Sequence, residues 1–291
     1  MATQTQTQTQ TSTQSTTLTA TSSPIPRGPV TATLNYFSPP ADGSSPYNYV
    51  ETPPPGEPQR NFSDAPTPTL ITDIRGSESA YSLDTNAFAA LPHVGLSAER
   101  AFTDDAAVQR NYYPEVERLL LDNLPGSPKR VLIFDHTIRR TIPNAKRGPV
   151  QRTHIDQTTA SAEERVHHHL PDEADELLKG RVRLVNVWRP INGAVESSPL
   201  AFADSSTVRD EDLVGIQHRY PDRTGETAAV KANEAQKWCY WSGMGNEERL
   251  LLQCYDSEKG GRVPHTAFVD PRSGEKAKGR ESIEVRALIF G

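Results

Sequence analysis

Alternation of apolar and polar residues marks the second half of the chain. Residues 181–188 read Arg-Val-Arg-Leu-Val-Asn-Val-Trp, and residues 282–290 read Ser-Ile-Glu-Val-Arg-Ala-Leu-Ile-Phe. Side chains two positions apart lie on the same face of a strand, so each stretch predicts a strand with two distinct faces. Shorter strands are predicted at residues 30–37, 131–134, 238–241, 250–255 and 265–269.

Helical patterns are fewer. Asp104 and Asp105 can cap a helix that runs through residues 114–121. Two shorter helices are predicted at residues 96–102 and 172–179. Short strands separated by Gly, Asp and Pro turns indicate a mainly β domain with flanking helices. We therefore expect a double-stranded β-helix core, which is a jelly roll of the cupin-like kind.

The chain divides into three compositional parts. Residues 1–24 are almost all Thr, Gln and Ser without charge, which predicts a disordered tail. Residues 25–70 are rich in proline and predict an extended arm. Residues 71–291 have the length of one catalytic domain with its own core.

Net charge and cysteine content limit the expected binding partners and the expected cellular compartment. The formal net charge is −6, which disfavours a nucleic-acid partner. The two cysteines, Cys239 and Cys254, do not form a disulfide framework, so a reducing compartment is expected. No long apolar run or signal-peptide pattern occurs. We expect a cytoplasmic monomer or homodimer without a membrane partner.

A His-x-Asp pair stands at His154 and Asp156. Residues two apart on a strand share a face, so one imidazole and one carboxylate can reach the same ion. His265 offers a second imidazole. Two histidines and one carboxylate are the facial triad of iron(II) oxygenases, with positions left open for cosubstrate and O2. A His-x-Asp pair is common by chance, and strand histidines are often core residues, so the assignment depends on the residues C-terminal to His265.

The last predicted strand carries Arg280, Ser282, Glu284 and Arg286 on one face and apolar residues on the other. A guanidinium matches a carboxylate through two hydrogen bonds, and a serine hydroxyl adds a donor. This face therefore suits 2-oxoglutarate, with its far carboxylate on the arginines. A solvent-facing Arg/Glu ladder is the alternative. Arg272 is a weaker candidate because it lies in a turn-like Pro-x-x-Gly sequence.

The order His265, then Arg280-x-Ser282, is similar to that of iron/2-oxoglutarate oxygenases, and Arg286 resembles the second arginine of the AlkB and FTO demethylases. Several blocks in a fixed order resemble a fungal hydroxylase/desaturase family that includes AsaB-like and gibberellin-desaturase-like enzymes. These blocks are residues 134–139, 154–158, 186–191, 199–201, 238–240, 264–268 and 282–286.

The resemblance implies a non-haem iron(II) enzyme that uses 2-oxoglutarate and O2. It implies hydroxylation, desaturation or oxidative cyclisation of a small molecule in secondary metabolism. Trp188, Arg189, Arg139 and Tyr240 are then candidates for the substrate pocket. Core packing of the two aromatic residues and a surface position for Arg139 are the alternatives. The run His167-His168-His169 is better explained as a helix end or loop than as a metal site.

Three other functions are compatible with such a barrel. A non-catalytic small-molecule-binding barrel would have lost the metal, although the intact triad argues against it. A metal enzyme of the same fold that does not use 2-oxoglutarate would bind substrate through the arginines. A nucleic-acid demethylase of the AlkB type would need a basic surface, which the acidic charge disfavours.

Overall fold

The computed structural model describes Met1, residues 25–143 and residues 145–291, so the expected disordered tail falls almost entirely outside the described residues. The strands are β1 (Val30–Ser38), β2 (Tyr47–Tyr49), β3 (Ser63–Asp73), β4 (Phe88–Leu91), β5 (Arg130–Arg140), β6 (His154–Ile155), β7 (Val182–Pro190), β8 (Leu200–Ala203), β9 (Leu213–Arg219), β10 (Thr224–Val230), β11 (Trp238–Tyr240), β12 (Arg249–Asp256), β13 (His265–Ala267) and β14 (Glu281–Phe290). The helices are α1 (Leu83–Asn86), α2 (Asp105–Asn111), α3 (Tyr113–Asn123), α4 (Thr159–His169) and α5 (Ala174–Leu177), with short 3-10 turns at Glu78–Ala80, Ser205–Thr207 and Asp210–Asp212.

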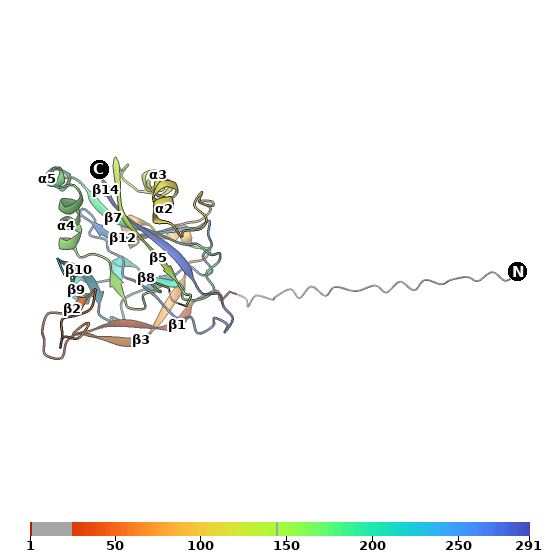
Figure 1. Cartoon of the computed structure of the whole chain (residues 1–291), viewed down its shortest axis with the longest axis horizontal. Coiled ribbons are helices and arrows are strands. Elements are labelled where there is room, and N and C mark those ends of the chain that lie inside the picture. Colours follow the sequence, from red (N-terminus) through yellow and green to blue (C-terminus); the bar gives the residue numbers. More distant parts are fainter. Residues whose placement is uncertain (2–24, 144) are drawn as a thin grey trace.

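Two sheets build the molecule (Figure 1). One has nine strands in the order β1-β3-β11-β8-β13-β6-β10-β9-β2, and the other has five in the order β4-β12-β7-β14-β5. The strands are short, most neighbours are antiparallel, and the helices lie outside the sheets. The expected mainly β class with flanking helices is confirmed, and two sheets around a shared core are the arrangement of a jelly roll.

The proline-rich stretch contributes directly to the larger sheet. β1 pairs with β3 along its whole length, and β3 continues parallel to β11. The strand predicted at residues 30–37 is therefore confirmed as β1. Apolar side chains of β1 pack on β8 and β11, so residues 30–73 share a core with the rest of the molecule.

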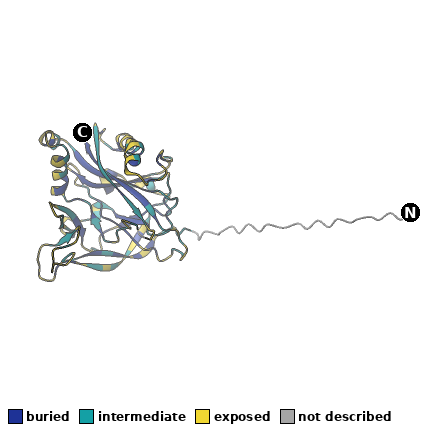
Figure 2. Ribbon diagram, in the orientation of Figure 1, coloured by how far each residue is buried: buried dark blue, intermediate teal, exposed yellow. Residues whose placement is uncertain are grey.

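β7 and β14 lie at the centre of the smaller sheet and are buried on both faces (Figure 2). Their outer faces pack against α2 and α3, through Val185, Val187, Ile283, Val285 and Ala287. The two-faced strands predicted from alternation are thus confirmed. On the opposite faces, Asn186 of β7 and three polar residues of β14 point toward the larger sheet, where the candidate site lies: Ser282, Glu284 and Arg286.

The helix predictions had mixed outcomes. The Asp104 carboxylate accepts the Ala106 backbone N–H and caps a helix, as predicted, but the single helix expected through residues 114–121 is divided into α2 and α3 at Tyr112. The helix predicted at residues 96–102 is wrong. The Glu99 carboxylate accepts the backbone N–H groups of Ala101 and Phe102, which holds the segment as a loop. The helix predicted at residues 172–179 shortens to α5.

The helix α4 was not predicted, and it positions the site. Thr158 and Ser161 form a reciprocal capping box at its start. Ala162 and Val166 on its buried face pack against Ile155 of β6 and Leu184 of β7. α4 thereby closes one end of the space between the sheets, directly after the segment that carries His154 and Asp156.

Candidate metal centre

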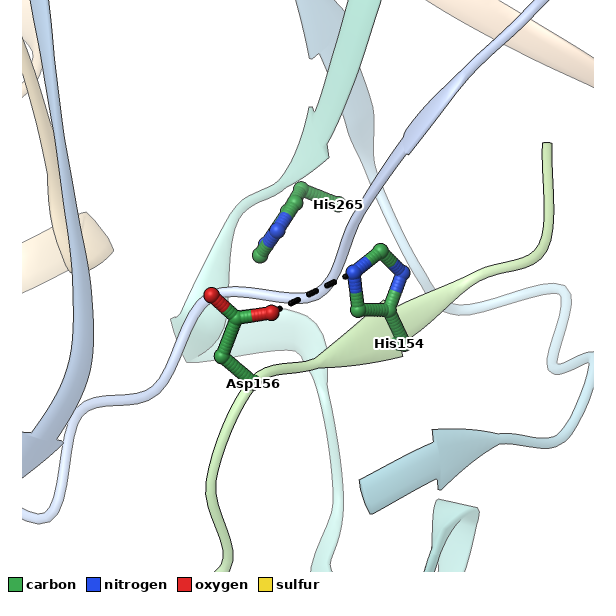
Figure 3. A group of neighbouring side chains, drawn as sticks. All are labelled: His154, Asp156 and His265. Atoms are coloured by element: carbon green, nitrogen blue, oxygen red, sulfur yellow. Dashed lines mark ion pairs between the residues drawn. The ribbon is translucent and has the colours of Figure 1, made fainter. Parts of the chain in front are cut away.

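The three predicted ligands meet between the sheets (Figure 3). His154 in β6 is the cross-strand partner of His265 in β13, and their ring centroids lie 4.5 Å apart. Asp156 follows β6, and one ligand atom from each residue lies within 4.8 Å of the others. Strand pairing thus brings together residues that are distant in the sequence.

Each histidine is oriented by its own backbone. His154 Nδ1 lies 2.8 Å from the carbonyl oxygen of Arg152, and His265 Nδ1 lies 3.2 Å from that of Val263. A carbonyl only accepts hydrogen bonds, so Nδ1 carries the proton in both rings. Each Nε2 is left with a free lone pair, which is the form that binds a metal.

Asp156 is held by two side chains from the smaller sheet. Its Oδ2 accepts hydrogen bonds from Arg286 Nε at 2.7 Å and from Asn186 Nδ2 at 2.8 Å. Its Oδ1 lies 3.4 Å from His154 Nε2. Burial would raise the pKa of Asp156, but Arg286 and the two histidines outweigh it and hold that pKa well below its usual range. The carboxylate is therefore ionised at neutral pH.

The donor set fits iron(II). Burial lowers the pKa of His265 to about 4, with His154 adding to the effect, so this ring is neutral at pH 7. The cluster combines an ionised carboxylate with imidazole lone pairs at close range, and a cation relieves the repulsion between these acceptors. Two histidines and one carboxylate are the ligands of non-haem iron(II) oxygenases.

A cavity borders both histidines, and Arg280 enters it from the opposite sheet. The buried guanidinium lies 5.3 Å from the Trp188 ring, donates from Nη1 to the Ser198 carbonyl at 2.7 Å, and leaves Nε without a partner. Burial lowers the pKa of Arg280 to about 9, with Arg139 adding to the effect. Among the described residues no carboxylate pairs with Arg280. An anionic ligand would supply the missing partner.

Other polar side chains line the same cavity. Ser282, Arg139 and Glu284 reach it, together with Thr137 and Thr266. Its volume is about 20 Å³, room for roughly one water molecule. A ligand larger than water would enter it only after lining side chains move. Arg139 is held by one bond, from Nη1 to the Gly148 carbonyl, in the loop after β5.

Arg286 does not line the cavity that Arg280 enters, and lies instead beside the metal carboxylate. Besides Asp156, it pairs with Asp135 at 3.0 Å and with Glu284 at 2.8 Å. Burial would lower the pKa of Arg286, but these carboxylates raise it well above its usual value. Arg286 thus contacts the metal carboxylate, whereas Arg280 and Ser282 face the cavity.

Of the remaining candidates for the substrate pocket, one lines the cavity and two point elsewhere. Trp188 lines the cavity. Arg189 points to the outer face of β7, between the rings of Phe102 and Tyr112. Tyr240 lies in the core of the larger sheet and donates a hydrogen bond to the Gly28 carbonyl at 2.7 Å.

Asn186 was missed as a residue that orients the metal carboxylate. The alternation of residues 181–188 had placed it on the same face as Trp188, and that was the available signal. His167, His168 and His169 form the end of α4, as expected. Both cysteines are buried and unpaired, and Arg272 ties its turn to the carbonyls of residues 27–29.

Comparisons with known proteins show the family to which the chain belongs. Residues 34–290 match the protein family described as "Oxidoreductase/YMDC permease-like domain". The hydroxylase/desaturase poxK of Penicillium oxalicum is 34% identical over 259 residues, covering 77% of this chain and 79% of poxK. The alpha-ketoglutarate-dependent dioxygenase phiK of a fungal species is 32% identical, covering 90% of this chain and 96% of phiK.

A solved structure shows the same architecture. The iron and alpha-ketoglutarate-dependent endoperoxidase NvfI superimposes with a TM-score of 0.82 at 30% identity, covering 91% of this chain and 99% of NvfI. The expected jelly-roll core is thereby confirmed. The chain belongs to the fungal hydroxylase/desaturase family of non-haem iron, 2-oxoglutarate-dependent oxygenases.

Proposed function

We propose that this protein is an Fe(II)/2-oxoglutarate-dependent oxygenase that oxidises a small molecule of secondary metabolism by hydroxylation, desaturation or ring formation. His154, Asp156 and His265 hold the iron. The convergence of these three side chains, with both Nε2 atoms and Asp156 Oδ1 free of competing donors, carries the proposal. The names of the relatives support the reaction class.

The cosubstrate site is assigned to the cavity beside the histidines. Arg280 and Ser282 bind the far carboxylate of 2-oxoglutarate, because Arg280 is buried and lacks an acidic partner. Arg139 moves to admit the cosubstrate and then faces it. Arg286, fully engaged with three carboxylates, keeps Asp156 in place.

Bound iron with 2-oxoglutarate and O2 would supply the oxidising chemistry that removes hydrogen from a C–H bond. The protein's residues provide the setting for that chemistry. The smaller sheet fixes the metal carboxylate through Arg286 and Asn186. The apolar core that contains Trp188 keeps one wall of the cavity dry.

The proposal includes a small-molecule substrate and a cytoplasmic location. Two unpaired, buried cysteines are compatible with a reducing compartment. Within the described residues, no helix combines the length and the apolar character needed to span a bilayer.

The test is an oxygen-free titration with iron(II) and then 2-oxoglutarate, read as a visible charge-transfer band, followed by succinate formation with O2. The wild type should give the band, His154→Ala should not, and His167→Ala, at the exposed end of α4, should give the band as the wild type does. A wild-type protein that binds iron but gives no band with 2-oxoglutarate would favour a metal enzyme of the same fold that does not use the keto acid.

A further inference from the structure

A groove runs between α4 and the hairpin of β9 and β10. Its volume is about 480 Å³, within the range of small-molecule sites. α4 packs beside β10 in the fold (Figure 1). The groove is lined by Ser161, Glu164, Arg165, His167, His168 and residues 223–226. It shares no lining residue with the cavity that borders the histidines.

Two arginines in this groove have no acidic partner. Arg165 is half-buried, with its guanidinium 5.1 Å from the centre of the Phe134 ring. Arg223 lies 3.9 Å from the centre of the Tyr220 ring. Among the described residues, neither guanidinium has a carboxylate within ion-pair distance. Stacking restrains both side chains while their edge N–H donors remain available.

The acidic residues of the groove do not neutralise these arginines. Glu226 accepts a hydrogen bond from the Thr158 hydroxyl, at the start of α4. Glu164 is exposed to solvent. The groove therefore offers guanidinium groups to an incoming ligand, and water screens the exposed carboxylate.

β10, which lines the groove, pairs with β6, where Ala229 lies opposite the metal ligand His154. Burial lowers the pKa of Arg165, Asp135 opposes the fall, and Arg223 and Arg286 add to it. Arg165 stacks on Phe134, and the next residue, Asp135, pairs with Arg286, which contacts the metal carboxylate. On the facing hairpin, His218 is paired with Gly225 in the groove wall. Burial lowers the pKa of His218.

We propose that this groove is where the substrate binds, and that Arg165 and Arg223 bind a carboxylate of the substrate. The inference rests on the proposed function and adds a substrate class to it: small molecules that bear a carboxylate at one end. The carboxylate is anchored at α4 and the remainder of the molecule extends toward the iron. Arg165 is then a residue that determines substrate specificity.

The test uses oxygen-free protein saturated with iron(II) and 2-oxoglutarate, so that Arg280 is already occupied. Binding of benzoate, cinnamate, naphthalene-2-carboxylate and octanoate is compared by calorimetry with binding of their primary amides. At least one acid should bind roughly tenfold more tightly than its amide, the gain expected from a hydrogen-bonded charge pair. Arg165→Gln and Arg223→Gln should each reduce this preference, and Arg165→Lys should retain part of it.

Arg118→Gln, on the exposed face of α3, is the matched control and should leave the preference unchanged. The charge-transfer band is recorded on every sample. A normal band with no preference for acids over amides in the wild type, or with a preference that survives both glutamine variants, overturns this inference and leaves the proposed function intact. Absence of the band in the wild type instead contradicts the proposed function.

Discussion

Replacing Arg286 by glutamine should weaken iron binding although Arg286 is not a ligand. The bond from Arg286 Nε to Asp156 Oδ2 is 2.7 Å long and joins side chains that are 13% and 12% exposed. A hydrogen bond to a charged group contributes about 1.5–3 kcal/mol. Its loss should lower iron affinity roughly 10–100-fold, the range seen when a partner of a metal ligand is removed.

The positive charge of Arg286 affects iron affinity in the opposite direction from its hydrogen bond to Asp156. The guanidinium is positive and repels an incoming cation, so its removal by itself would strengthen binding. Arg286 is, however, surrounded by Asp156, Asp135 and Glu284, which leave no net positive charge around it. The loss of orientation at Asp156 should therefore prevail.

The change should also alter how stability depends on pH. The pKa of Asp156 is depressed in the folded protein, so its stabilisation is present at neutral pH and is lost as the pH falls through the folded value. Without Arg286 this pKa rises. Metal-free Arg286→Gln should thus be less stable than the wild type at pH 7, and the Asp156 part of that difference should vanish in acid.

The assay is an oxygen-free iron(II) titration beside thermal unfolding at several pH values. Arg181→Gln is the matched control, because it breaks an equally buried ion pair with Asp256 far from the metal. That variant should lose stability and keep its iron affinity. A folded Arg286→Gln protein that binds iron as tightly as the wild type would refute the reasoning.

Four further results are expected. Arg280→Gln should raise the 2-oxoglutarate concentration needed for the charge-transfer band by roughly 10–100-fold, and Ser282→Ala should raise it less, since Arg280 supplies the charge. His265→Ala should abolish iron binding measured by titration, whereas His167→Ala should not. Acidification should not release iron through protonation of His265 until the pH approaches 4, and a metal-release curve against pH checks this. Arg189→Met should leave the band unchanged and the melting temperature equal or higher, because Arg189 is buried with Nη1 unpartnered between two aromatic rings.

The local alternation of apolar and polar residues was sufficient to predict the strands β7 and β14. The alternation in β7 and β14 follows from a strand period of two, and both strands were predicted with their faces correctly divided. The loop at residues 96–102 could not be predicted from periodicity, because its shape depends on the Glu99 carboxylate binding backbone N–H groups. α4 was missed although Thr158 and Ser161 provide a capping signal.

The site shows where single-sequence reasoning ends. His154 and Asp156 are two residues apart, so their proximity follows from strand geometry alone. The pairing of Asp156 with Arg286 spans 130 positions and depends on how β14 faces β6 across the core. Nothing local in the sequence specifies that arrangement, so Arg286 could be placed on the right face without its partner being known.

The histidine and aspartate ligands are oriented by different parts of the protein. Each histidine takes its proton position from a main-chain carbonyl two residues before it, which every amino acid at that position provides. The aspartate instead depends on two particular side chains from the other sheet. Substitutions at Arg152 and Val263 are therefore expected to leave the proton positions of the two histidines unchanged. A single substitution at Asn186 or Arg286 is therefore expected to disturb the orientation of Asp156.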